Sequence, residues 1–305
     1  MLDIIAVILP IFLVIMLGFI LNKARWLNEG FITTSNQLIF YVFFPVFLFH
    51  NIASSNFKEN FSLIPIIVLI STTLVVFFLG FIVAKLLKLN IHQTGTFVMD
   101  SFRGNIGYIG MAVCLYVYGQ EGLTAAGIVI AFATPLVNIL SIVALGAASS
   151  SSFKLSTITK DTLLNPLIIA CLAGIAVSLS GIALPLFING TLAIVSDITL
   201  PLALIAIGAT MNINQIRGSR LVIASSTAIK IILLPALAYI TFLLLGDTSI
   251  TAKATVILLA CPSAAVTYVV AQSMGGDPDL ANATIVISTI ASIFTFVLWL
   301  QVLGV

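Results

Sequence analysis

The sequence predicts an all-helical integral membrane protein with ten transmembrane helices, arranged as two inverted repeats of five. Its composition, the spacing of its apolar runs and an internal repeat carry this prediction. Of 305 residues, 61% are hydrophobic and 7% are charged, against about 45–50% and about 25% in a typical soluble domain. This composition favours a polytopic membrane protein and argues against a soluble enzyme or a nucleic-acid-binding protein.

Ten apolar runs are long enough to cross a bilayer, which takes about 20 residues in a helix. In chain order they are residues 3–22, 33–53, 62–84, 93–118, 122–148, 162–181, 191–212, 219–245, 252–275 and 280–303. The connections between them are short, so we expect the chemistry to lie inside the bundle. The first span follows Met1-Leu2-Asp3 instead of a basic segment, and we expect it to be retained and not cleaved as a signal peptide.

The basic residues between spans predict the orientation of the chain. The odd-numbered loops hold Lys23, Arg25, Lys85, Lys88, Lys154, Lys160, Arg217 and Arg220, and the even-numbered loops hold Lys58 and Lys253. Because cytoplasmic loops carry the excess of Lys and Arg, the odd loops are expected in the cytoplasm. Both termini are then periplasmic, and the protein is expected in the cytoplasmic membrane. Lys253 itself is interpreted as an anchor at the membrane interface.

An internal repeat relates the two halves. A shift of 156 residues places Pro10 on Pro166, Gly18 on Gly174 and Pro45 on Pro201, and a shift of 157 places Leu123 on Leu280 and Ala126 on Ala283. We therefore expect a first repeat at 1–148, a short cytoplasmic linker at 149–161 and a second repeat at 162–305. Five spans are an odd number, so the second repeat enters from the opposite side, an arrangement typical of secondary transporters. The alternative is ten spans that merely share a composition.

Two of the predicted spans are interrupted near their middle, at residues 103–107 in span 4 and 261–263 in span 9. A helix in lipid tolerates such a break only where the opened backbone faces protein, water or cargo. Paired breaks in corresponding positions indicate a transport site. The alternative is that Gly104, Gly107 and Gly110 form a small-residue face for close helix packing.

Each break should start a new half-helix, whose free N–H groups and positive dipole end lie near the midplane. Asn105 is expected to cap one half-helix, and Pro262 with Ser263 to begin the other. With the Arg103 guanidinium, these ends predict an anion site. The expected substrate-binding residues are Arg103, Gly104, Asn105, Tyr108, Pro262, Ser263 and Thr267.

Three further ionisable residues within spans are candidates for ion coupling, because such residues are costly in a membrane. They are Asp100, Asp197 and Lys230, and the expected ion is a proton or sodium. Two alternatives remain open: Asp100 pairs with Arg103 one turn away, and Asp197 snorkels to the outer face. The cysteines Cys114, Cys171 and Cys261 have no metal-ligand spacing, so neither a metal site nor another cofactor is expected, and no catalytic residues are assigned.

The chain resembles the auxin efflux carrier family, which includes bacterial malate and malonate permeases, over nearly its whole length. The resemblance is carried by Leu9-Pro10 and Leu17-Gly18, Phe40-Tyr41-Val42-Phe43-Phe44-Pro45 with Leu48-Phe49, Phe102-Arg103-Gly104-Asn105 with Tyr108-Ile109-Gly110, Pro201-Leu202-Ala203-Leu204 with Ile207-Gly208-Ala209, and Ala260-Cys261-Pro262-Ser263-Ala264 with Ala271-Gln272-Ser273-Met274-Gly275-Gly276-Asp277. It implies a fold like that of bile-acid/sodium symporters and sodium/proton antiporters. Spans 1, 2, 6 and 7 would form a scaffold, and the other spans a mobile core in which spans 4 and 9 cross at Asn105 and Pro262.

The chain departs from the plant exporters in two places. Arg103-Gly104-Asn105 stands where they carry a proline crossing, and the loop at 149–161 is short where theirs is commonly long. A basic group at the crossing fits a small carboxylate at least as well as an auxin.

These features predict a secondary or facilitative transporter that moves a small organic anion, such as malate, malonate or an auxin-like acid, by alternating access. The alternatives are a cation antiporter coupled to sodium or protons and a bile-acid-type symporter. An intramembrane aspartyl protease would need Asp100 and Asp197 to face each other. A receptor is disfavoured because the sequence has no output domain. The expected partners are the anion, the bilayer and a second copy of the chain in a homodimer, with no nucleic acid.

Overall fold

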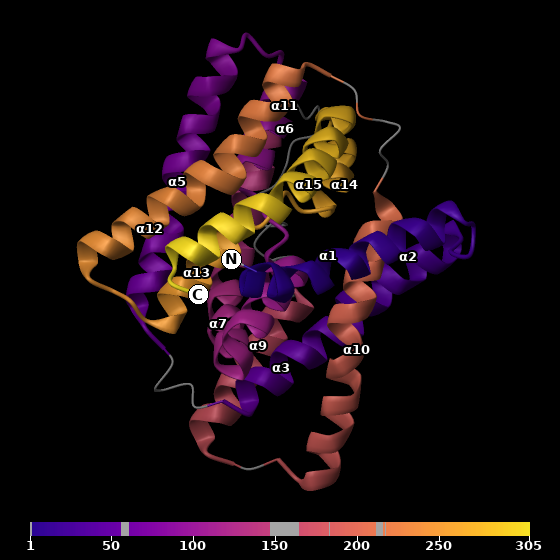
Figure 1. Ribbon diagram of the computed structural model, residues 1–305, viewed down its shortest axis with the longest axis vertical. Helices are drawn as coiled ribbons and strands as arrows, with labels where there is room; N and C mark the ends of the chain where they lie inside the picture. The colour runs from indigo at the N-terminus through magenta and orange to yellow at the C-terminus, as the bar shows by residue number, and fades with distance from the viewer. Residues whose placement is uncertain (1, 56–60, 147–164, 183, 212–215, 217) are drawn as a thin grey trace.

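The computed structural model describes residues 2–55, 61–146, 165–182, 184–211, 216 and 218–305, which form helices and one isolated β-bridge (Figure 1). The all-helical prediction is confirmed over these residues. The helices are α1 Leu2–Lys23, α2 Glu29–Leu38, η1 Ile39–Phe43, α3 Phe44–Ala53, α5 Leu63–Leu86, α6 Ile91–Phe102, η2 Ile106–Gly110, α7 Met111–Gly146, α9 Pro166–Ser180, α10 Leu186–Thr210, α11 Arg220–Ala228, η4 Ile229–Leu233, α12 Leu234–Leu245, α13 Ile250–Leu259, α14 Val266–Ser273 and α15 Pro278–Val302. The expected linker at 149–161 lies outside the described residues, as do Lys58, Lys154, Lys160 and Arg217.

Within the described residues, six helical segments are long and apolar enough to cross a membrane, and shorter apolar helices accompany them. One of the six, Ile106–Gly146, has 41 residues, about twice the length that a bilayer requires. Gly119, with φ 62° and ψ −148°, divides it at a kink between the expected spans 4 and 5. The outward faces carry large apolar side chains such as Phe78 and Phe294, exposed by 61% and 74%, which suits contact with lipid.

Three of the described continuous helical segments contain a π-helical turn, in which the backbone hydrogen bonds lengthen by one residue. One of the turns, η2, opens the segment Ile106–Gly146. Segment η1 joins α2 to α3, and η4 joins α11 to α12. The Thr199 hydroxyl donates to the Phe43 carbonyl at the end of η1, at 3.2 Å. The Trp299 indole donates to the Ile231 carbonyl in η4, at 2.9 Å. Side chains from other helices thus satisfy carbonyls that a π-turn leaves without its usual partner.

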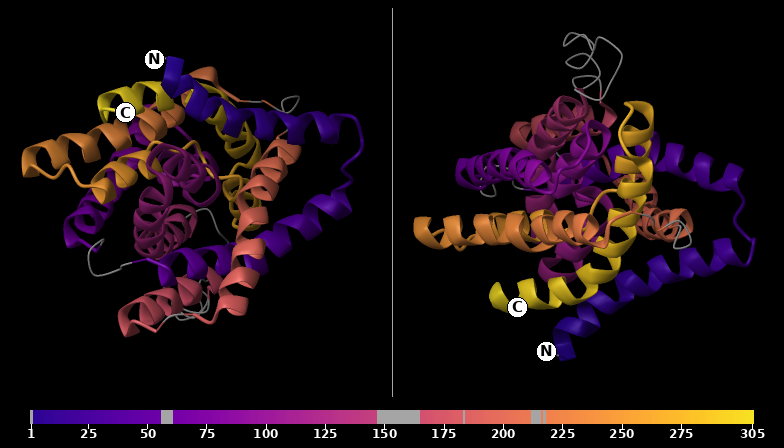
Figure 2. Two further views of the ribbon diagram at one scale, coloured as in Figure 1. Left: turned by 60° about the horizontal axis from the view of Figure 1, so that its bottom comes forward. Right: turned by 90° about the horizontal axis from the view of Figure 1, so that it is seen from above.

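The helices pack in two sets. Helix α1 packs along α10, and α3 packs against α9 and α10. The second set comprises α5, α6, α7 and α11 to α15, which pack mainly on one another. Figure 1 shows α2 and α10 on the right of the molecule and α5 and α12 on the left. The start of α1 and the end of α15 lie close together in every view (Figures 1 and 2).

Glycines set the closest approaches within the first set. A Cβ added at Gly18 of α1 would lie 2.1 Å from the Ile205 carbonyl oxygen of α10, and one at Gly208 would lie 1.8 Å from the Ile15 oxygen. A Cβ at Gly174 of α9 would lie 3.1 Å from the Phe49 oxygen of α3. Small residues let helix backbones touch in a membrane, where packing must hold helices together.

Candidate functional site

Both expected breaks are present. Helix α6 ends at Phe102 because Arg103 takes an extended conformation, with φ −79° and ψ 98°. Segment η2 begins at Ile106, and the Asn105 side chain accepts the Tyr108 N–H at 3.4 Å, which confirms the expected cap. In the other half, α13 ends at Leu259 and α14 begins at Val266. The proline and glycine positions therefore located both interruptions correctly.

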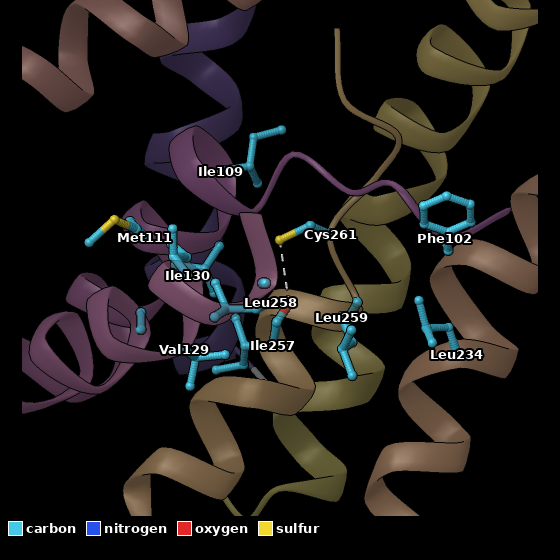
Figure 3. Packing of buried hydrophobic residues seen from close by; sticks show 14 of the residues in the cluster. Phe102, Ile109, Met111, Val129, Ile130, Leu234, Ile257, Leu258, Leu259 and Cys261 are labelled. Carbon is cyan, nitrogen blue, oxygen red and sulfur yellow. Dashed lines mark hydrogen bonds between the residues drawn. The ribbon is translucent and has the colours of Figure 1, made fainter. Parts of the chain in front are cut away.

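The two interruptions pair with each other. Gly104 and Ser263 form an antiparallel bridge, in which Asn105 N donates to Pro262 O at 2.8 Å and Ala264 N donates to Arg103 O at 3.1 Å. Figure 3 shows the non-helical stretch that follows Phe102 passing beside Cys261. We call residues 103–105 and 262–264 the crossing. Two of its backbone amides find acceptors across the bridge, which helps to satisfy the break inside a membrane.

Two amides near the expected anion site already have hydrogen-bond partners within the fold. Asn105 N is bonded to Pro262 O, and Ser263 N donates to the Ser288 hydroxyl at 3.0 Å. These two amides hold the fold together instead of standing free. The first-turn amides of a helix have no acceptor within the helix. Here these are the amides at 106–107 of η2 and at 265–266, where α14 begins, and all four residues are partly or fully exposed.

Arg103 binds the helix that follows the kink in α7. Its guanidinium donates to Asn138 Oδ1 and Ser141 Oγ, each at 2.8 Å, and to the Val137 carbonyl at 3.4 Å. The alternative of an ion pair with Asp100 is wrong, because neither Asp100 oxygen has a hydrogen-bond partner. The predicted ion pair assumed that Arg103 continues the helix three residues after Asp100. Arg103 lies beyond the end of α6, and its side chain turns to α7. The residue as a whole is partly exposed.

Asp100 and Thr267 flank the crossing along the chain and are fully buried. Asp100 is in the last turn of α6, and its backbone carbonyl accepts the Ser263 hydroxyl at 3.2 Å. Thr267, in the first turn of α14, donates its hydroxyl to the Ala264 carbonyl at 2.6 Å. The structure therefore brings these two predicted residues together with the crossing.

Lys230 reaches the crossing from η4. Its side chain is fully buried, and its amine donates to Leu259 O, at the end of α13, at 2.6 Å. A Cβ on Gly104 would lie 2.8 Å from Lys230 Cε, so only glycine lets the lysine lie against the bridge. An amine at a helix C-terminus offsets the negative end of its dipole.

Replacing Lys230 with Met should leave the unfolding free energy within about 1 kcal/mol of wild type. The variant loses the hydrogen bond of the amine, but it also avoids the cost of burying a polar amine, and the two contributions are of similar size. Lys230→Ala should cost about 2–4 kcal/mol, since it opens a cavity beside Gly104. Unfolding in mixed detergent micelles measures both. Equal losses in the two variants would show that the amine, and not the packing of the side chain, is what stabilises this region.

The remaining predicted residues lie farther from this polar centre or at its edge. Tyr108 packs against Phe44 of α3, with 5.3 Å between ring centroids, so it links the crossing to the first set of helices. Asp197 is exposed on α10, beside Ser196, whose hydroxyl faces His50 of α3 at 3.4 Å. Asp197 and the fully buried Asp100 thus lie in unlike environments, without the shared exposure to substrate that an aspartyl dyad needs.

Several polar residues at the site were not assigned a role from the sequence. These are Ser141 in α7, Ser226 in α11, and Thr284 and Ser288 in α15, all buried. Their spacing could have indicated a polar helix face. Asn138 and Ser141 are three residues apart, and Thr284 and Ser288 are four apart, so each pair lies on one face of its helix.

A cavity of about 350 Å³ lies elsewhere, between the ends of α3 and α9. It is lined by residues 53–55, 177–178 and 181–182. It does not include residues of the crossing, and it holds none of the predicted substrate-binding side chains.

Comparison with known proteins identifies the family. The model of a family described as "Membrane transport protein" matches residues 3–145 and 149–300. A "Putative malonate transporter" of Rhizobium meliloti is 26% identical over 97% of this chain and 94% of its own length. An "Uncharacterized transporter" of Methanothermobacter thermautotrophicus is 27% identical over 97% of each chain. The paired, broken helices thus occur in a chain that belongs to the membrane transport protein family, and it is a transporter and not an enzyme.

Proposed function

We propose that the chain is a secondary transporter of a small organic anion, with the carboxylate bound at the exposed side of the crossing. The observation that carries the proposal is the bridge between Gly104 and Ser263, which sets two half-helix N-termini beside the partly exposed Arg103. Positive helix ends and a guanidinium both favour carboxylate oxygens. The first-turn amides at 106–107 and 265–266 would supply hydrogen bonds, and Arg103 would supply the charge.

We also propose ten spans in two inverted repeats, with both termini outside the cytoplasm. Equivalent contacts support this arrangement. Gly18 meets Ile205, and Gly174 meets Phe49, so a shift of 156 carries Gly18 onto Gly174 and Phe49 onto Ile205. The adjacent start of α1 and end of α15 (Figure 2) fit an even number of crossings.

Alternating access would follow from motion between the two helix sets. The set with α1, α3, α9 and α10 would serve as the scaffold, and the set with α5 to α7 and α11 to α15 as the moving core. The close backbone contacts of Gly18 and Gly208 support a rigid scaffold. The crossing lies within the core, so movement of the core would carry the bound anion.

A cation antiporter on the same fold would place an accessible acid beside the crossing. Here the accessible ionisable group is Arg103, whereas Asp100 is fully buried. This difference favours an anion as the transported substrate. The "Putative malonate transporter" among the relatives points to the same class.

Counterflow in proteoliposomes tests the proposal. Vesicles loaded with unlabelled malonate should accumulate labelled malonate faster than protein-free vesicles, and malate or succinate should compete where glucose and lysine do not. Exchange of sodium for protons without any carboxylate flux would contradict the proposal and favour the antiporter.

A further inference from the structure

One amide side chain lies deep within the apolar helix α7. Asn138 is about 12 Å from the end of the helix at Gly146, at 1.5 Å per residue. Its neighbours along the chain are Val137 and Ile139. An amide at such a depth costs free energy unless its polar atoms find partners. The role of Asn138 therefore depends on which of its atoms have partners.

The side-chain oxygen of Asn138 is committed to the protein. Arg103 Nη2 donates to Asn138 Oδ1 at 2.8 Å. A guanidinium has donors and no acceptor, so the amide can meet Arg103 only through its oxygen. This contact fixes which branch of the amide is the nitrogen, an assignment that otherwise rests on the hydrogen-bond network. The Nδ2 branch, with its two N–H donors, is left for another acceptor.

Two nitrogens at this contact keep unused donors. Asn138 Nδ2 and Arg103 Nε donate to none of the described residues, and both residues are partly exposed. Over the same part of the chain, the enclosed side-chain atoms without a partner belong to Thr73, Asp100, Tyr118, Thr227 and Thr295. Because neither nitrogen is one of these enclosed atoms, both retain contact with accessible space. A solute in this space meets N–H groups whose hydrogen bonds are not yet made.

The two free donors lie close together. Arg103 Nε is bonded to the same carbon as Nη2, and Asn138 Nδ2 is bonded to the same carbon as Oδ1. The 2.8 Å hydrogen bond between Nη2 and Oδ1 therefore joins the two groups that carry the free donors. A carboxylate has two oxygens, which together accept about four hydrogen bonds. One carboxylate can thus bond the guanidinium through one oxygen and the amide through the other.

We propose that Asn138 is a further substrate-binding residue, whose Nδ2–H groups act with the Arg103 guanidinium to hold one carboxylate of the transported anion. This assignment rests on the proposed function. It also defines the chemical form of the group that is bound. Because Arg103 occupies Oδ1, the pair offers donors alone, and it therefore binds an ionised carboxylate better than a carboxamide or a protonated acid, which bring donors of their own.

Ser141 is a matched control, because it makes the same kind of contact without a free donor. Arg103 Nη1 donates to Ser141 Oγ at 2.8 Å, and the Ser141 hydroxyl donates its single hydrogen to Val137 O at 2.6 Å. Ser141→Ala and Asn138→Ala each remove one 2.8 Å contact of the guanidinium. Asn138→Ala also removes the donors assigned to substrate.

Malonate counterflow in proteoliposomes, measured over a range of malonate concentrations, separates the two roles. Asn138→Ala should raise KM about 5-fold and keep the maximal rate within about 2-fold of wild type, whereas Ser141→Ala should raise KM by less than about 2-fold. Asn138→Asp keeps an oxygen for Arg103 but replaces the donors by a negative charge. It should raise KM by more than about 50-fold while the Tm of the purified protein stays at or above that of wild type.

Equal changes of KM in Asn138→Ala and Ser141→Ala would show that Asn138 only holds Arg103, and would overturn the assignment. Malonate transport by Asn138→Asp with the KM of wild type would overturn it too, and this variant keeps the contact with Arg103 if Asn138→Ala does not fold. Both results leave the proposed function intact, because they require a wild-type protein that transports malonate. A wild-type protein without any carboxylate counterflow would instead overturn the proposed function itself.

Discussion

Arg103→Ala is expected to lower the initial rate of malonate counterflow by about 100-fold. In the proposed site the guanidinium supplies the charge that binds the carboxylate, and hydrogen bonds to a charged group contribute about 1.5–3 kcal/mol. Each 1.4 kcal/mol is a factor of ten in affinity. Loss of the charge and its hydrogen bonds should therefore weaken carboxylate binding by about 100-fold. Rates normalised to folded, monodisperse protein measure this effect.

Arg103 also ties α6 to α7, so two controls separate binding from structure. Asn138→Ala removes one 2.8 Å contact of the guanidinium but keeps the cation, and it should lower the rate by less than about 10-fold. Arg220→Ala, at an exposed position on α11, should leave the rate unchanged. A rate for Arg103→Ala equal to that of Arg220→Ala would remove Arg103 from substrate binding.

Gly208→Ala should destabilise the protein by about 3 kcal/mol or more. The added methyl group would lie 1.8 Å from the Ile15 carbonyl oxygen, a backbone atom that no rotamer change can move aside. Helices α1 and α10 would have to separate along their shared face, where Gly18 also meets the Ile205 carbonyl. Overpacking of this kind usually costs about 1–3 kcal/mol and sometimes more.

Gly190→Ala is the matched control for this change. It lies on the same helix, and a Cβ there meets nothing within 4 Å, so alanine should be neutral or slightly stabilising. Gly18→Ala, 2.1 Å from the Ile205 oxygen, should behave like Gly208→Ala. Unfolding curves in which Gly208→Ala and Gly190→Ala coincide would show that α1 and α10 do not touch through their backbones.

The sequence predicted the helices and both interruptions because their signals are local. Apolar runs set where helices form, and each expected span has a helical segment near its predicted range. The break at Arg103 to Asn105 and the break at Pro262 follow from residues that end or cap helices whatever surrounds them. Transmembrane orientation and the number of spans stay predictions.

The partners of the site residues could not be predicted, because they come from distant parts of the chain. Helical spacing placed Asp100 near Arg103, but the guanidinium turns to Asn138, 35 residues away. Free amides were expected near Asn105, but the amide of Asn105 itself donates to Pro262 O, in the other half of the chain. Hydrogen-bond satisfaction inside a bundle is decided by which helices meet, and a single sequence does not state this.

The position of a bound dicarboxylate tests the central claim most directly. An experimental structure of the protein with bromomalonate, located by the anomalous scattering of bromine, would show where the substrate lies. We predict the ligand within hydrogen-bonding distance of Arg103, between the first turns of η2 and α14. Ligand found instead in the cavity between α3 and α9, with the crossing unoccupied, would contradict the account.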